Sequence, residues 1–404
     1  MIKLLIGLGL VLVPFYELLL RMFPCVTTIS PDTRLTKELM TCILCLGIAL
    51  LALFKGQLKE FKNKYLLWFV FLLLASINFI PRVPAFINNV DSTSFWIWKP
   101  ILQSLIVLLF CITVSSLEVA KCDIKNLFKI ISVSGALMAG YCILQALGFD
   151  GLYITKSVKI IGSVEVPNIG GLLGQPTLVA PFLALTIPFS LALKKFGIIS
   201  TILCMIAVIL TGSQIAIGAM IISLLIYLCL YFRKIPLYIL SVLLILCLGY
   251  YVYSTKQVGD NGRFGVWKQV ISDVKEGPLE NQEVDSSLFG AGIGSFPYLF
   301  SPKHHSTWKQ PHNAYLRILY FGGFTGLILF LLSIWYVAKN TLYEALHQTG
   351  EKRTVIIATL CSLICILLCA VGSFVLQLGV YWYYGAIIVG LLHNQQFIKG
   401  EYHV

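Results

Sequence analysis

The chain has 404 residues, of which 58% are hydrophobic and only 12% are charged, and its mean hydropathy is +0.87. Soluble domains are about 45–50% apolar and about 25% charged, so a soluble fold is nearly excluded. The net charge of +12 comes from short Lys and Arg clusters between apolar runs, which argues against a nucleic-acid-binding face or arm. The composition therefore predicts an integral membrane protein.

Apolar runs long enough to cross a bilayer recur along the chain, and a spanning helix needs roughly 20 largely apolar residues. We predict about twelve transmembrane helices, near residues 2–21, 39–54, 65–80, 100–117, 128–147, 176–193, 197–212, 214–232, 236–254, 315–338, 354–374 and 376–393. No internal repeat is evident. We expect an all-α polytopic membrane protein in which residues 1–404 form a single membrane domain.

The basic residues lie mainly in alternate connections between these runs. Basic connections stay on the cytoplasmic side of a membrane. With the N-terminus inside, the inner connections hold Lys55, Lys59, Lys62, Lys64, Lys121, Lys125, Lys194, Lys195, Arg233, Lys234, Lys339, Lys352 and Arg353. Both termini are then cytoplasmic, and residues 148–175 and 255–311 face outward. Loops of this length are usually functional, so we expect the large loop 255–311 to carry the active site.

The beginning of the large loop has the pattern of an amphipathic helix. Its apolar residues recur at a helical period, at Phe264, Trp267, Ile271 and Val274. We expect this helix to lie on the membrane surface. Arg263, beside the free N–H groups of the first turn, would suit phosphate binding. An ordinary surface arginine near a helix start is equally compatible with the pattern.

Two motifs resemble ligand sites but favour structural interpretations. The alternate glycines in residues 289–296 lack a preceding strand and the GxGxxG spacing, so they predict a backbone bend that permits close approach. Cys361, Cys365 and Cys369 share one helix face among apolar neighbours. They predict helix packing in preference to a metal stripe.

The end of the large loop concentrates the histidines. Three of the six, His304, His305 and His312, lie here, and no carboxylate or thiol stands near them at a recognisable ligand spacing. We therefore predict no metal site. His312 directly precedes a spanning helix and suits proton abstraction from an attacking hydroxyl. Together with Arg263 as an anion clamp, it would serve glycosyl transfer from a lipid diphosphate.

The sequence from His312 onward resembles the O-antigen ligase family, whose members share His-Asn, nine residues and Gly-x-x-Gly. Here His312-Asn313 is followed by nine residues and then by Gly323-Phe324-Thr325-Gly326. Residues 262–267, 289–296 and 174–177 are also similar to the family. The resemblance covers roughly residues 165–335, and the flanking helices agree in type and number.

The resemblance implies an O-antigen ligase-like glycosyltransferase of lipopolysaccharide biosynthesis in the bacterial inner membrane. Its members move a glycan from undecaprenyl diphosphate to a lipid A core sugar on the periplasmic side, with inversion and without metal or cofactor. It implies that His312 is catalytic, that Arg263 binds the diphosphate and that Asn313 orients the site. We assign Gly323 and Gly326 to close helix packing.

One position departs from the family pattern. Members often carry an arginine after a serine between the seventh and eighth helices, whereas here Gln214 follows Ser213. Gln214 and Lys309 are therefore our further candidates for substrate binding. Either a cation such as Lys156, Lys159, Lys303 or Lys309 replaces the arginine, or the diphosphate is held differently, or this member is not a lipid A core ligase.

Several functions remain open at this level. An O-antigen polymerase, which extends the lipid-linked repeat unit, shares the architecture, and so does a protein O-oligosaccharyltransferase, which we rank third. A transporter of lipid-linked glycan would show broken helices and paired halves, and neither is visible in the sequence. The expected partners are the lipid-linked donor, a saccharide acceptor and membrane lipids, without nucleic acid.

Overall fold

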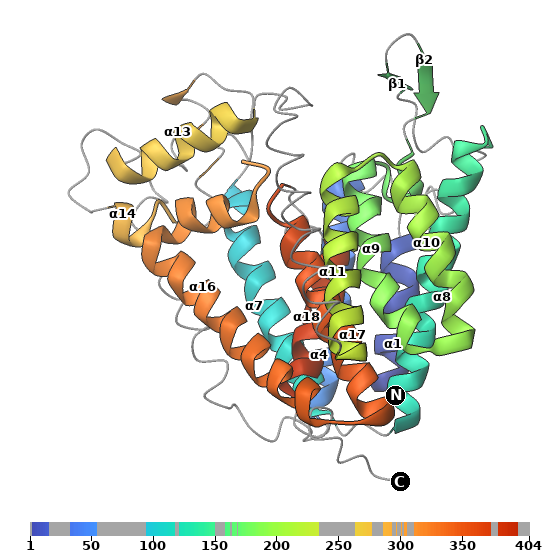
Figure 1. Cartoon of the computed structure of the whole chain (residues 1–404). Helices are drawn as coiled ribbons and strands as arrows, with labels where there is room; N and C mark the ends of the chain where they lie inside the picture. Colours follow the sequence, from blue (N-terminus) through green and yellow to red (C-terminus); the bar gives the residue numbers. More distant parts are fainter. Residues whose placement is uncertain are drawn as a thin grey trace.

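The computed structural model describes residues 2–15, 33–54, 94–117, 121–149, 158–161, 164–167, 169–233, 263–276, 286–292, 296, 300, 303–304, 311–372 and 379–394. These residues form a helical bundle with one short β-hairpin (Figure 1). The helices predicted at 65–80 and 236–254 lie outside the described residues. The described parts of the other predicted spans lie mainly in helices, whereas 16–21, 373–374 and 376–378 also lie outside the described residues, so the all-α expectation holds for the described residues apart from the hairpin.

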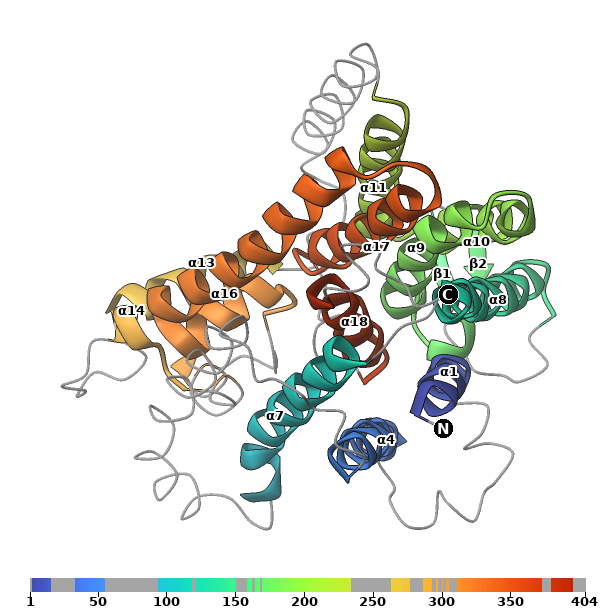
Figure 2. The same ribbon diagram turned by 90° about the horizontal axis from the view of Figure 1, so that it is seen from below.

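The bundle is built from α-helices, with two short 3₁₀ turns among them. They are α1 (Ile2–Leu12) with η1 (Val13–Phe15), α4 (Thr33–Phe54), α7 (Ser94–Ser116), α8 (Lys121–Ala146), α9 (Pro176–Ala192), η5 (Lys194–Gly197), α10 (Ile198–Leu210), α11 (Gln214–Phe232), α16 (Ala314–His347), α17 (Gly350–Cys369) and α18 (Gly379–His393). Two shorter helices, α13 (Arg263–Glu276) and α14 (Ser286–Phe289), lie beside α16, away from α8 and α10 (Figures 1 and 2).

Four helices in the described part of the chain are long and apolar enough to cross a membrane: 123–146 in α8, 214–232 in α11, 314–347 in α16 and 350–369 in α17. Shorter apolar helices accompany them at 2–15, 41–54, 103–116, 176–192 and 383–393. The chain is thus a helical protein with membrane-length apolar segments. The count of about twelve spans stays a prediction.

Several helices extend beyond their predicted ends, and the two longest extensions are in α16 and α8. α16 continues to His347, past the predicted end at 338, and α8 begins at Lys121, before the predicted start at 128. Lys339 therefore lies within a helix and not in a connection. The reason is that the apolar pattern marks only the segment suited to lipid, whereas the neighbouring Ala, Leu, Glu and Lys residues also favour helix.

The centre of the bundle is α9, which is buried along most of its length between α8, α10, α11 and α17. Small hydroxyl side chains allow close contact there. Ser190 Oγ donates to Ser132 Oγ at 2.9 Å, and Ser200 Oγ donates to the Ser132 carbonyl at 2.7 Å. Such residues are typical of helix contacts in membranes.

The three cysteines of α17 face the same interior. Cys361, Cys365 and Cys369 are fully buried in the apolar core. Their burial among apolar side chains agrees with the predicted role in helix packing.

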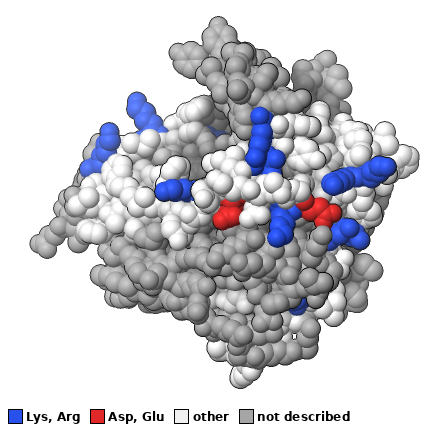
Figure 3. Space-filling model, turned by 60° about the horizontal axis from the view of Figure 1, so that its bottom comes forward, with Lys and Arg blue, Asp and Glu red and all other residues white. Residues whose placement is uncertain are grey.

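One end of the bundle carries several basic residues. Lys194, Lys195, Lys352 and Arg353 lie at the end that contains both the η5 turn and the start of α17, and Figure 3 shows Lys and Arg side chains spread over this end. Arg353 Nε donates to the Ala345 carbonyl at 3.1 Å and thereby caps the end of α16. Of the connections predicted to be cytoplasmic, the two that contain these four residues therefore lie at the same end.

The hairpin lies beyond the opposite end of the bundle (Figure 1). Strand β1 (Val158–Ile161) pairs antiparallel with β2 (Val164–Pro167), with Ile161 opposite Val164. A 3₁₀ turn, η4 (Gly171–Leu173), follows and leads into α9. Gln145 Oε1 accepts a hydrogen bond from Gly171 N at 2.9 Å, so this polar residue ties the loop to α8.

Candidate functional site

Helix α13 forms a second, smaller core with the first part of α16. Val266, Val270 and Val274 are buried in this core, together with residues of α16 that include Leu319, Tyr320 and Phe321. The helix predicted at the start of the large loop is confirmed, but its buried face differs from the predicted apolar face. Phe264 and Ile271 are 62% and 41% exposed. Its placement on a membrane surface stays a prediction.

The start of α16 is fixed by several backbone contacts. Asn313 is its N-cap, and Asn313 Oδ1 accepts from the backbone N–H groups of Tyr315 at 2.9 Å and Leu316 at 3.1 Å. Ala314 N donates to the Ala370 carbonyl at the end of α17, at 2.9 Å. Asn313 therefore orients the segment that carries His312. Its contact with substrate stays a prediction.

His312 has a left-handed backbone with φ of 52° and lies half-buried just before α16. Burial, and secondly the positive charge of nearby Arg263, lower the pKa of His312 from 6.5 to about 4. The imidazole is therefore neutral at pH 7, which is the form that can accept a proton. The structure thus brings together the two residues singled out from opposite ends of the large loop.

Arg263 is the first residue of α13 and points toward the end of α17. Its Nη1 donates to the Gly372 carbonyl at 3.1 Å, and its buried Nε has no partner among the described residues. One turn further along α13, Trp267 Nε1 donates to the Pro311 carbonyl at 2.7 Å. Two side chains of α13 therefore hold the segments on either side of the site.

The first turn of α11 approaches the same place. A Cβ built on Gly372 would stand 1.9 Å from Ile215 Cδ1, so Gly372 allows α11 to pass close to the carbonyl that receives Arg263. Gln214 is the exposed first residue of that helix. The second substrate-binding candidate, Lys309, lies outside the described residues.

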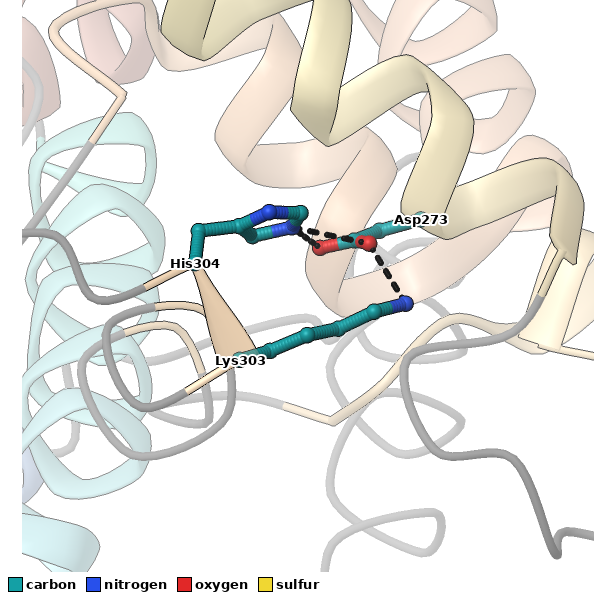
Figure 4. Close-up of polar contacts among 3 residues, drawn as sticks. All are labelled: Asp273, Lys303 and His304. Carbon is teal, nitrogen blue, oxygen red and sulfur yellow. Dashed lines mark hydrogen bonds and ion pairs between the residues drawn. The ribbon is translucent and has the colours of Figure 1, made fainter.

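An ion cluster ties the far end of α13 to the end of the large loop (Figure 4). The carboxylate of Asp273 is 2% exposed, and it accepts from Lys303 Nζ at 2.8 Å and contacts His304 Nε2 at 2.9 Å. Sequence reasoning missed Asp273, although its position on the stripe of Val266, Val270 and Val274 was a usable signal. Lys303, one of the cations considered for diphosphate binding, is engaged by this carboxylate.

The glycine motifs of 289–296 and 323–326 meet at a break in α16. Gly323 has non-helical angles (φ 60°, ψ −164°), so the carbonyls before it lack their helical partners. Ala291 N donates to the Tyr320 carbonyl at 2.7 Å, and Gly292 N to the Phe321 carbonyl at 2.9 Å. The predicted backbone bend at Gly290–Gly292 and the close packing of Gly323 are therefore confirmed.

Potential metal ligands do not converge in the described part of the chain. No group of three or more His, Cys, Asp or Glu side chains there is arranged to hold a metal ion. The metal independence of the site stays a prediction.

Together the fold and the site define a polytopic helical membrane protein with a histidine–arginine pair at the end of the bundle opposite its basic connections. The family model described as O-Antigen ligase matches residues 199–331. The match includes α10, α11, Arg263, His312 and the Gly323 break. The resemblance to the O-antigen ligase family is therefore confirmed over this segment. A search of curated proteins found no match.

Proposed function

We propose that the protein is a glycosyltransferase that moves a glycan from undecaprenyl diphosphate to a lipid A core sugar, with inversion and without metal or cofactor. The observation that carries this proposal is the proximity of a neutral His312 to the guanidinium of Arg263. A base beside a fixed cation is what a displacement from a diphosphate requires. The family match over residues 199–331 supports the same reaction class.

In the proposed step the neutral imidazole of His312 removes the proton of the acceptor hydroxyl. The hydroxyl oxygen attacks the anomeric carbon of the donor, and the bond from that carbon to the diphosphate oxygen breaks. The leaving diphosphate takes the electron pair, and Arg263 stabilises its charge. A single displacement on the opposite face inverts the anomeric configuration.

Arg263 has a second effect on this step, because its charge weakens His312 as a base. A bound diphosphate would offset that charge and raise the pKa of His312 from about 4 toward its ordinary value. A stronger base is then present when the donor is bound. Donor binding and acceptor activation are coupled through this one pair of residues.

The remaining candidates would complete the binding site. Gln214 at the start of α11 and Lys309 in the large loop are proposed to contact the donor, with Asn313 fixing the direction of the His312 segment. Exposed apolar side chains on α13, such as Phe264, suit contact with membrane lipids.

We place the protein in the bacterial inner membrane with both termini cytoplasmic and the loop of residues 255–311 in the periplasm. The gathering of Lys and Arg at the end of the bundle opposite His312 supports this orientation. Undecaprenyl-linked donor and core acceptor would then meet at the periplasmic face.

The test is transfer by purified protein in vesicles, with polyprenyl-diphosphate glycan, lipid A core acceptor and a chelator. Glycosylated core that forms in the presence of chelator supports the proposal. Lengthening of the donor glycan without core product identifies the alternative, an O-antigen polymerase. Movement of labelled donor across the vesicle without any transfer identifies a transporter and contradicts an enzyme.

A further inference from the structure

We propose that Trp267 is a positioning residue for His312, and that its indole N–H holds the Pro311 carbonyl so that His312 keeps its left-handed backbone beside Arg263. This inference rests on the proposed role of His312 as the base. It assigns a role to a side chain that touches neither the acceptor nor the donor in the proposed step.

The backbone of His312 needs support because its φ of 52° is unfavourable for a residue with a Cβ. Such conformations persist only where surrounding contacts determine them. On the C-terminal side, that support is the Asn313 cap and the bond from Ala314 N to the Ala370 carbonyl. On the N-terminal side, it is the bond from Trp267 Nε1 to the Pro311 carbonyl, at 2.7 Å.

The position of Trp267 on α13 matters as much as the length of its hydrogen bond to Pro311. Trp267 lies one helical turn after Arg263 on α13, so both side chains leave the helix on the same side. Arg263 is held by the Gly372 carbonyl and Trp267 holds Pro311. α13 packs against α16 through the buried Val266 and Val270. One helix therefore carries both the cation and the side chain that holds the residue before His312.

The test replaces Trp267 by Phe, which keeps an aromatic ring against Phe264 but removes the N–H donor. Trp335→Phe, an identical change at a 63% exposed tryptophan of α16, is the matched control. If Trp267→Phe folds poorly, β-(3-benzothienyl)alanine at position 267 removes only the N–H. Folding is checked by size exclusion and thermal unfolding, and kcat, the donor KM and the pH profile are then measured.

We expect kcat to fall about 10- to 100-fold, the effect of a small misplacement of a catalytic group. The donor KM should change by less than about twofold, since Arg263 keeps its own anchor on Gly372. The pH below which kcat/KM falls should rise, because His312 moves away from the positive charge of Arg263, which lowers the pKa of His312. A folded Trp267→Phe variant with wild-type kcat overturns the role of Trp267. A folded variant with reduced kcat but an unchanged pH dependence of kcat/KM overturns it as well. Wild-type activity in His312→Ala would instead overturn the proposed function.

Discussion

Gly290 and Gly323 lie backbone against backbone at the break in α16. A Cβ on Gly290 would stand 2.4 Å from Gly323 N, and a Cβ on Gly323 would stand 2.4 Å from the Leu288 carbonyl oxygen. Both glycines also have positive φ. The contact joins α14 to α16 at the break, where neither backbone leaves room for a side chain.

We expect Gly323→Ala to destabilise the protein, because the new methyl group meets backbone atoms and the φ of 60° disfavours any side chain. The cost should be about 1–3 kcal/mol for the backbone conformation, before the clash is added. Thermal unfolding in detergent measures it. Gly140→Ala is the control, since nothing lies within 4 Å of a Cβ there. Equal midpoints for the two variants would contradict the close packing at Gly323.

The ion cluster of Asp273 should contribute to stability and not to chemistry. Asp273→Asn removes the charge that pairs with Lys303 and contacts His304, at a carboxylate that is 2% exposed. We expect a loss of about 1–3 kcal/mol, with kcat changed much less than by substitution of His312. Thermal unfolding and steady-state rates test this expectation, with Lys275→Ala on the exposed face of α13 as control. A loss of kcat to the level of His312→Ala would assign the cluster a direct catalytic role.

The pH dependence should report the charge of Arg263. Protonated His312 cannot accept a proton, so activity falls as the pH drops through the pKa of His312. In the free enzyme that pKa is about 4, so kcat/KM should fall on the acidic side near pH 4. The fall of kcat should lie at a higher pH, because bound diphosphate offsets the positive charge of Arg263 and so raises the pKa of His312.

Arg263→Gln separates the two causes of the lowered pKa. Burial, the larger cause, persists, so the acidic limb of kcat/KM should rise above pH 4 but stay below 6.5. Lys268→Gln removes an exposed positive charge from the same helix and should leave the limb in place. A limb that does not move in Arg263→Gln would contradict the electrostatic pairing of Arg263 with His312.

Much of the fold follows from the sequence, because apolar length and helix-end signals are local. The prediction of 214–232 coincides with α11, and the prediction of 176–193 differs from α9 by one residue. The hairpin is not predicted from the sequence, although Val and Ile make up three of the four residues of β1, Val makes up two of the four of β2, and Gly162-Ser163 separates the strands. That pattern is a hairpin signal, and it was overlooked within a segment treated only as an outer loop.

The site was predictable in its chemistry but not in its construction. His312 and Arg263 stand out by residue type and by family resemblance, whereas their proximity depends on how α13 packs on α16. The partners of Arg263 and Trp267 are the carbonyls of Gly372 and Pro311, and backbone acceptors leave no trace in side-chain patterns.

The most direct test of the account is donor binding and turnover by His312→Ala beside the wild type. Binding of a polyprenyl-diphosphate glycan is measured by calorimetry, and single-turnover transfer by product formation. We predict that the variant binds the donor with near wild-type affinity, because Arg263 remains on Gly372, and that transfer falls by about 10²–10⁴-fold through loss of the base. Transfer at the wild-type rate would contradict the assignment of His312 as the base and the mechanism built on it.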